Sequence, residues 1–166
     1  MPQIHPFPPV WNECSRILIL GSFPSVRSRE EGFYYAHPQN RFWKVLAQIF
    51  EEPVPQSTEA RRDFALRHHI ALWDVIESCE ISGSSDASIR NATVNDFSSL
   101  LHASSIRQIC CNGQQAFKLY TRYCEKKIGK KALLLPSTSP ANAAWSLERL
   151  TEAWRPVLID KNSPAC

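Results

Sequence analysis

Short runs of apolar residues alternate along this chain with longer segments in which apolar side chains recur at helical spacing. A short apolar run bounded by turn residues is typical of a strand buried on both faces of a parallel sheet. Strands are predicted at residues 17–20, 70–73, 106–111 and 132–135. Helices are predicted at residues 41–50, 58–68, 96–101, 114–127 and 147–158, with Ser57 or Thr58, Asn95 and Ser146 as their N-caps where one is evident.

The alternation of strands with helices determines the expected architecture. It predicts an α/β fold, a three-layer α/β/α sandwich around a central four-stranded parallel sheet. The 166 residues, of which 43% are hydrophobic, are enough for one domain with a core. We therefore expect a single domain over residues 1–166, in which the proline-rich residues 1–12 form an N-terminal arm over the surface.

Polar or turn-forming residues follow each predicted strand. Gly21 to Ser25 follow the first strand, Asp74 the second, Asn112 the third and residues 136–142 the fourth. Because the carboxyl ends of parallel strands meet at one edge of a sheet, we expect a single ligand-binding crevice there. Its hydroxyl and amide groups favour chemistry by positioning and by stabilisation of developing charge. Residues 78–93 are polar and serine-rich, and they predict a long loop of the kind that is often functional.

Several established motifs are absent from the sequence. It has no phosphate-binding glycine loop, no nucleophile elbow, no pair of histidines at metal-binding spacing and no Cys-x-x-Cys pair. We therefore expect neither a metal nor a cofactor. The six cysteines are interpreted as buried or incidental free thiols.

The overall charge is mildly basic, with a formal net charge of +3 and a pI near 8.6. This charge permits a polyanionic partner without requiring one. The sequence has no apolar run of membrane-spanning length and no signal-peptide pattern at its start. We therefore expect a cytoplasmic protein without membrane contact.

Two blocks of the sequence resemble the uracil-DNA glycosylase superfamily. Residues 32–45 read G-F-Y-Y-A-H-P-Q-N-R-F-W-K-V, which is similar to the H-P-x-N-R-F-W-K block of that superfamily in its mismatch-specific branch. Residues 135–140, L-P-S-T-S-P, followed by S-L-E-R-L at 146–150, resemble its second motif and helix. The resemblance implies the α/β/α fold expected above, and an enzyme that acts on bases flipped out of DNA.

The first motif departs from the mismatch-specific uracil enzymes at one position. Those enzymes carry an Asn where this chain has Ser22, and the form with Ser there and an Asn in the H-P-x-N block resembles the branch that removes hypoxanthine. The resemblance implies that Asn40 is catalytic and orients a water molecule, that Tyr35 stacks on the flipped base and that Asp74 reads its edge. The other expected base-binding residues are Ser22, Phe23, His37 and Asn112. The expected DNA contacts are Ser25, Arg27, Arg41, Ser137, Thr138, Ser139, Pro140, Ala141 and Asn142.

Together these features predict a monomeric, monofunctional glycosylase of base-excision repair. It is expected to bind double-stranded DNA that contains deaminated bases and to excise chiefly hypoxanthine, with uracil as a further candidate, leaving an abasic site. Two alternatives stay open: a mismatch-specific uracil or thymine glycosylase, and a non-catalytic module that only binds lesions. Plainer roles also stay open for single residues, since Asn40 fits an ordinary N-cap, Asp74 a turn cap, and one of Tyr34 and Tyr35 the core.

Overall fold

A four-stranded parallel sheet forms the centre of the computed structural model, which describes residues 2–159. The strands are β2 (Ile17–Gly21), β3 (Ile70–Asp74), β6 (Gln108–Asn112) and β7 (Ala132–Leu135), in the spatial order β3-β2-β6-β7. All four predicted strands are confirmed in position and direction. The register sets Gly21 beside Asp74 and Asn112 beside Leu135, so the carboxyl ends are level.

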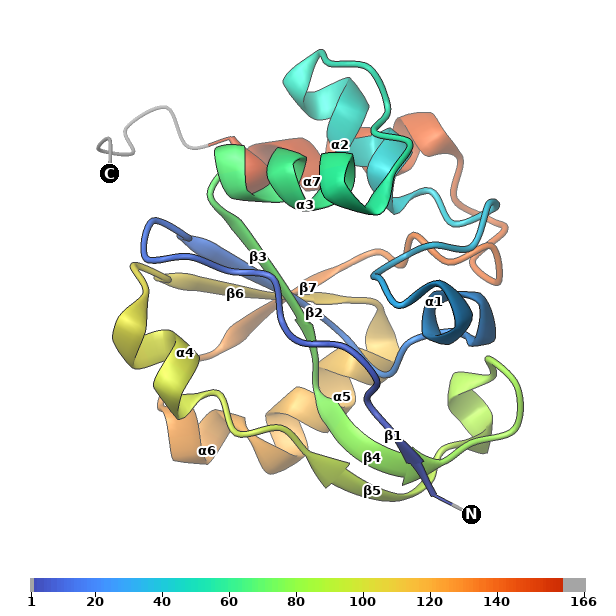
Figure 1. Ribbon diagram of the computed structural model, residues 1–166, viewed down its shortest axis with the longest axis vertical. Helices are drawn as coiled ribbons and strands as arrows, with labels where there is room; N and C mark the ends of the chain where they lie inside the picture. Colours follow the sequence, from blue (N-terminus) through green and yellow to red (C-terminus); the bar gives the residue numbers. More distant parts are fainter. Residues whose placement is uncertain (1, 160–166) are drawn as a thin grey trace.

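Helices cover both faces of this sheet, as expected (Figure 1). One layer contains α2 (Phe42–Phe50), α3 (Thr58–Arg67) and α7 (Leu147–Leu158), and the other contains α4 (Ser98–Ala103), α5 (Gln114–Tyr123) and α6 (Glu125–Ile128). The packing of β2 explains why its sequence is apolar throughout. Ile17 and Ile19 pack in the core beneath the first layer of helices, and Leu18 and Leu20 pack in the core beneath the second layer. None of the described helices has the length and apolar composition to cross a membrane.

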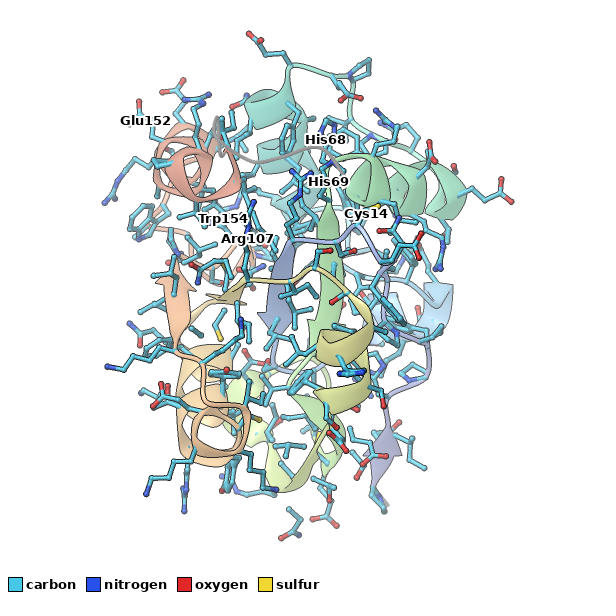
Figure 2. All side chains as sticks on the ribbon, turned by 90° about the vertical axis from the view of Figure 1, so that its left-hand side faces the viewer. Cys14, His68, His69, Arg107, Glu152 and Trp154 are labelled. Atoms are coloured by element: carbon cyan, nitrogen blue, oxygen red, sulfur yellow. The ribbon has the colours of Figure 1, made fainter. Side chains whose placement is uncertain are left out.

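Helix α7 is fixed to the sheet by a tryptophan. Trp154 is fully buried and packs edge to face against Phe42 of α2, with ring centroids 5.8 Å apart. Its indole nitrogen donates a hydrogen bond of 2.9 Å to the carbonyl of Pro136. Figure 2 shows this side chain directed from the helix toward the interior. The same residue therefore seals the core and anchors the start of the loop that follows β7.

A second, antiparallel sheet corrects the prediction of a long loop at residues 78–93. It consists of β1 (Gln3–Ile4), β4 (Ile76–Glu80) and β5 (Arg90–Val94), in the order β1-β4-β5. Strand β4 continues almost directly from β3, and only Ile76 and Cys79 of its five residues are buried. Because its exposed positions carry Glu and Ser, which are not typical of strands, the local pattern did not reveal it. The loop proper is confined to residues 81–89 and contains the short 3₁₀ helix η1 (Asp86–Ser88).

The N-terminal arm is integrated into the fold. Gln3 lies opposite Cys79 in the small sheet, and Val10 forms an isolated bridge with Leu72 of β3. The residues after β2 form a helix that was not predicted, α1 (Val26–Glu31), which Ser25 caps and Gly32 ends in a left-handed conformation. The predicted cap at Asn95 is wrong: its buried amide donates 2.9 Å to the backbone carbonyl of Asp74 instead.

Four of the cysteines are buried free thiols: Cys79, Cys110, Cys111 and Cys124. Burial raises the pKa of Cys110 and of Cys111 to about 12, so neither is a nucleophile at neutral pH. The interpretation as a free thiol is wrong for Cys14, which is disulfide-bonded. Within residues 2–159, no group of three or more His, Cys, Asp or Glu residues is arranged to hold a metal ion.

Gly21 is the point at which β2 meets the polar end of β3. A Cβ atom at this position would lie 2.5 Å from Oδ1 of Asp74 and 3.3 Å from the Tyr35 hydroxyl oxygen. Asp74 is 3% exposed and cannot easily move away. We expect Gly21→Ala to destabilise the protein by about 1 to 3 kcal/mol through overpacking, measured by urea denaturation. An unchanged midpoint would show that this strand end is looser than its packing indicates.

Candidate active site

The predicted crevice exists at the carboxyl ends of the strands. A cleft of about 610 Å³ opens there, within the size range of small-molecule sites. Its lining residues come from α1, the loop after β7 and the tip of the β4–β5 hairpin, among others, and these elements lie together at the right-hand end of the main sheet in Figure 1. Every candidate base-binding residue lines it, as do most of the candidate DNA contacts; Arg27, Arg41 and Asn142 do not.

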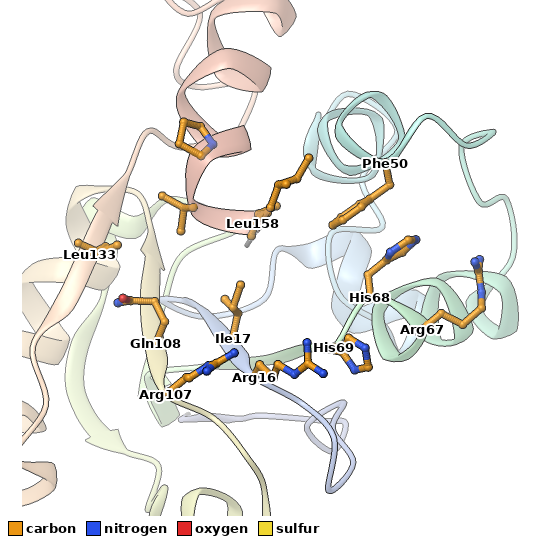
Figure 3. Close-up of a pocket in the computed structure, with 13 residues that line it drawn as sticks. Arg16, Ile17, Phe50, Arg67, His68, His69, Arg107, Gln108, Leu133 and Leu158 are labelled. Carbon is orange, nitrogen blue, oxygen red and sulfur yellow. The ribbon is translucent and has the colours of Figure 1, made fainter. Parts of the chain in front are cut away.

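A larger cleft, of about 960 Å³, lies at the opposite end of the sheet (Figure 3). Its walls carry Arg16 and Arg107 beside Ile17 and Leu158. Figure 2 shows Arg107 and the neighbouring His69 at this same end of the molecule. None of the site residues predicted from the sequence lines it, and amino ends of parallel strands are not where open α/β sheets bind their ligands. The smaller cleft is therefore the candidate active site.

Asn40 is held at one wall of the cleft by two hydrogen bonds to its carbonyl oxygen. The backbone N–H of Phe42 donates to Oδ1 at 2.9 Å, and the hydroxyl of Thr138 donates to the same atom at 2.9 Å. The N-cap position expected for Asn40 is held by Arg41, the residue before Phe42, but the first bond still satisfies an N–H in the first turn of α2. The two bonds use both lone pairs of the carboxamide oxygen. Only its N–H₂ group, which makes no hydrogen bond to the described residues, remains available to a ligand.

The orientation of the Asn40 amide is fixed by a further partner. Asn112, at the end of β6, accepts from the backbone N–H of Thr138 at 3.0 Å and donates to the Thr138 hydroxyl at 3.0 Å. Since that hydroxyl accepts from Asn112, its own hydrogen points to Asn40. Thr138 is completely buried. The β6 end, the loop after β7 and the start of α2 are therefore connected by one hydrogen-bond network, in which Thr138 joins Asn112 to Asn40.

Tyr35 forms a second wall, and Tyr34 belongs to the core. Tyr34 is 2% exposed and donates to the carbonyl of Pro8 at 3.1 Å. Tyr35 has a positive φ of 52°, which is unusual for a residue other than glycine and is often found at functional sites. One face of its ring stacks on Phe42 at 4.1 Å between centroids, so only the other face remains for a ligand.

The hydroxyl of Tyr35 lies buried at the cleft wall without a hydrogen-bond partner of good geometry among residues 2–159. Burial and the nearby Asp74 carboxylate raise the pKa of Tyr35 well above its usual range, while the adjacent Asn112 amide lowers it. The phenol is therefore protonated at neutral pH. It offers one hydrogen-bond donor and lone pairs to whatever occupies the cleft.

Asp74 is paired with a residue that the sequence analysis did not select. Its Oδ2 atom lies 2.7 Å from Nε2 of His5, and both side chains are only 4% exposed. Nδ1 of His5 lies 2.8 Å from the carbonyl oxygen of Phe7, which can only accept, so Nδ1 carries a proton. The expected contact of Asp74 with a base edge is thus limited to Oδ1, the oxygen beside Gly21 and Tyr35.

The motif position Ser22 contacts a carboxylate from a distant loop. Its hydroxyl donates to Oδ1 of Asp86 at 2.7 Å. Asp86 begins η1 at the tip of the β4–β5 hairpin, and it lines the cleft together with Ser84 and Ser85. Residues 78–93 were expected to be functional as a group, but no local pattern singled out Asp86, because the contact with Ser22 spans 64 positions of the chain.

The loop after β7 is anchored by Arg41. The guanidinium donates to the carbonyls of Ser139 at 2.9 Å, Asn142 at 3.0 Å and Trp145, while the backbone N–H of Arg41 donates to Thr138 at 3.0 Å. These contacts argue against the direct DNA contact expected for Arg41 and assign it to holding the loop. Asn142 likewise donates to the carbonyl of Ser137 at 3.0 Å within the loop.

Other expected contacts lie at the mouth of the cleft or beside it. Pro140 and Ala141 are exposed at the loop tip. His37 accepts from the backbone N–H of Gln39 at 3.1 Å through Nδ1, which leaves Nε2 for a ligand. Ser25 caps α1, and Arg27 is exposed on α1 in an ion pair with Glu31. Phe23 lines the cleft but is largely buried against Ile76 and Cys79.

Fold and cleft together define a class of protein. A parallel α/β/α sandwich that gathers amides, hydroxyls and a tyrosine at its strand ends has the architecture of a uracil-DNA-glycosylase-like enzyme. The model of the uracil DNA glycosylase superfamily matches residues 8–158. The chain belongs to this superfamily.

Individual relatives are similar along almost the whole chain. A hypoxanthine DNA glycosylase from Methanosarcina acetivorans is 35% identical over 91% of this chain and 95% of its own length. A hypoxanthine DNA glycosylase from Methanosarcina barkeri is 34% identical over 89% of this chain and 93% of its own. The solution NMR structure of a proposed uracil DNA glycosylase from Methanosarcina acetivorans superposes with a TM-score of 0.80, at 34% identity, over 95% of this chain and 97% of that one.

Proposed function

We propose that this protein is a monofunctional DNA glycosylase that hydrolyses the N-glycosidic bond of deoxyinosine, releases hypoxanthine and leaves an abasic site. The observation that carries the proposal is the cleft itself, in which Ser22 occupies the motif position and Asn40 presents only its amide N–H₂. The two relatives of similar length that are hypoxanthine DNA glycosylases support the same substrate.

The base fits between the free face of Tyr35 and the polar ends of the strands. Hypoxanthine has acceptors at O6, N3 and N7 and a donor at N1. The Tyr35 hydroxyl can donate to one of the acceptors, and Oδ1 of Asp74 can accept from N1–H, which adenine lacks. Buried groups that a substrate leaves unpaired impose a strong penalty, so this arrangement discriminates against adenine.

The DNA must present the base outside the helix. Flipping a nucleotide out of a duplex costs a few kcal/mol, and less when the base is mispaired. We assign the exposed loop tip at Pro140 and Ala141 to the duplex side of the cleft, with Ser137, Ser139, Ser25 and Arg27 near the phosphates. The mild net charge of +3 predicts an affinity that falls as the salt concentration rises.

The chemistry requires neither an amine nor a metal. Cleavage of an N-glycosidic bond passes through a sugar cation that resembles an oxocarbenium ion, which water then traps. A lyase step through a Schiff base needs an amine at the sugar, and none of the lysines among the described residues lines the cleft. The Asn40 N–H₂ group can hold the oxygen of the water or of the sugar by donation.

The decisive experiment uses three labelled duplexes, containing inosine, uracil or a G·T mismatch, each followed by alkaline cleavage. We expect strand breaks at inosine, because an abasic site is alkali-labile. Breaks only at uracil or at G·T would replace the proposal with a mismatch-specific uracil or thymine glycosylase. Retention of the inosine duplex without breaks would indicate a lesion-binding module instead.

A further inference from the structure

The cleft lacks an obvious acceptor for the proton of an attacking water. The Asn40 oxygen already accepts two hydrogen bonds, and the Thr138 hydroxyl donates its only proton to Asn40. The hydroxyl of Ser22 donates to Asp86. Amide N–H groups donate but do not accept, so Asn40 can position a water and cannot deprotonate it.

Two carboxylates line the cleft, Asp74 and Asp86, and each has one oxygen that is hydrogen-bonded to another side chain. Asp74 is buried and its Oδ2 is bound by His5. Asp86 remains open to solvent at the hairpin tip, and Ser22 occupies only its Oδ1. Oδ2 of Asp86 makes no hydrogen bond to residues 2–159. Because the unbonded Oδ1 of Asp74 is assigned above to N1–H of the base, Oδ2 of Asp86 is the carboxylate oxygen left for a water in the cleft.

The hairpin tip is held firmly enough to present this oxygen in one place. Arg29 of α1 donates to the carbonyl of Gly83 at 2.6 Å, and the backbone N–H of Val26 donates to the Ser84 hydroxyl at 2.9 Å. The Ser22–Asp86 bond is a third attachment, from the end of β2. Two hydrogen bonds from α1 and one from Ser22 thus hold the tip of the β4–β5 hairpin beside the end of β2.

The surroundings of Asp86 make it a stronger base than an ordinary aspartate. Desolvation of the carboxylate by the surrounding protein raises the pKa of Asp86, the Ser22 hydroxyl partly offsets this, and the negative charge of Asp74 adds to the rise. A general base works best when its pKa approaches the working pH, so the direction of the shift favours proton abstraction.

We propose that Asp86 is the general base of this enzyme: its carboxylate, held by Ser22 in the cleft that Asn40 also lines, takes a proton from the attacking water. The inference rests on the proposed glycosylase function. The C1′–N9 bond breaks and its electron pair leaves with hypoxanthine, and the water oxygen then bonds to C1′ of the resulting sugar cation as Asp86 takes the proton. The proton on Asp86 then passes to the departing base or to solvent, so the products are hypoxanthine and an abasic deoxyribose.

The test compares single-turnover release of hypoxanthine from an inosine duplex by Asp86→Asn, Glu77→Gln and the unaltered protein. Asn can still accept from Ser22 but cannot take a proton, so we expect its rate to fall by about 100-fold or more while DNA binding is kept. Glu77 is exposed on β4 of the same hairpin and lies outside the cleft, so its variant loses the same charge without effect. An Asp86→Asn rate within about threefold of the unaltered protein would overturn the proposal.

A second variant separates catalysis from loop structure. Asp86→Ala opens a space in which formate can act as the missing carboxylate, and we expect added formate to restore its rate several-fold but to leave Asp86→Asn unchanged. An Asp86→Ala rate that formate does not raise would assign Asp86 to holding the hairpin and overturn the proposal. If the unaltered protein releases no hypoxanthine, it is the proposed function that fails, and that result is visible before any variant is made.

Discussion

We expect replacement of Asn40 by Ala to lower the rate of inosine excision by about 100- to 1,000-fold. The magnitude is that of losing one preorganised donor from a site that stabilises a charged transition state. The donor is the Asn40 N–H₂ group, which the bonds from Phe42 and Thr138 hold in one orientation. The measurement is single-turnover cleavage of an inosine duplex, with binding to the same duplex followed separately by fluorescence anisotropy.

Asn40→Asp is the matched variant, because it separates the N–H₂ donor from the contacts of the Asn40 oxygen. An aspartate keeps the oxygen that accepts from the Phe42 N–H and from Thr138, so the start of α2 stays attached to the loop after β7. It replaces the N–H₂ group by a second acceptor, so the donor is lost. We expect Asn40→Asp to be as slow as Asn40→Ala while melting at a higher temperature. If Asn40→Asp excises inosine at the original rate, Asn40 acts only through the hydrogen bonds to its side-chain oxygen, which support the start of α2.

The main sheet was predictable because three of its strands, β2, β3 and β6, are largely buried on both faces. Each contributes apolar side chains to two cores, as Ile19 and Leu20 do in β2, and such a run is visible without knowledge of the fold. The helices with a long apolar face, such as α7, were predicted for the same reason. Strand β4 and the short helix α1 were not predicted. The composition of β4 is not typical of a strand, and the six residues of α1 are too few to show a helical period.

The candidate site, like the fold, has residues that the sequence pattern reveals and residues that it does not. Ser22, Asp74, Asn112 and Thr138 lie at the carboxyl ends of strands or just after them, and parallel topology alone brings them to one cleft. Asp86 and His5 reach this region from the second sheet and the N-terminal arm, through pairings that span 64 and 69 positions. Long-range contacts of this kind leave no periodic signal in the sequence. The part of the site that depends on topology was therefore predictable, and the part that depends on loop docking was not.

The His5–Asp74 pair carries the largest expected effect on stability. His5→Ala leaves the Asp74 carboxylate in an almost completely buried position without its partner. Removal of one member of a buried pair typically costs about 3 to 5 kcal/mol, and we expect a loss of that size in urea denaturation. His102 is exposed on α4, so His102→Ala serves as the control and is expected to stay close to the original stability. An equal, small loss in both variants would show that the pair contributes nothing.

The double variant His5→Ala, Asp74→Asn identifies the source of that loss. If an unpaired buried charge is responsible, the neutral amide at position 74 restores a large part of the stability that His5→Ala removes. If the loss comes instead from the packing of the His5 ring, which lies 4.7 Å from Phe7 between centroids, the second substitution adds a further loss. Restored stability in the double variant would show that the N-terminal arm acts on the cleft electrostatically. His5 of the arm pairs with Asp74, and the Asp74 carboxylate also lies beside Gly21 and Tyr35. The arm would then be part of the structure that fixes how the base is read, although none of its residues lines the cleft.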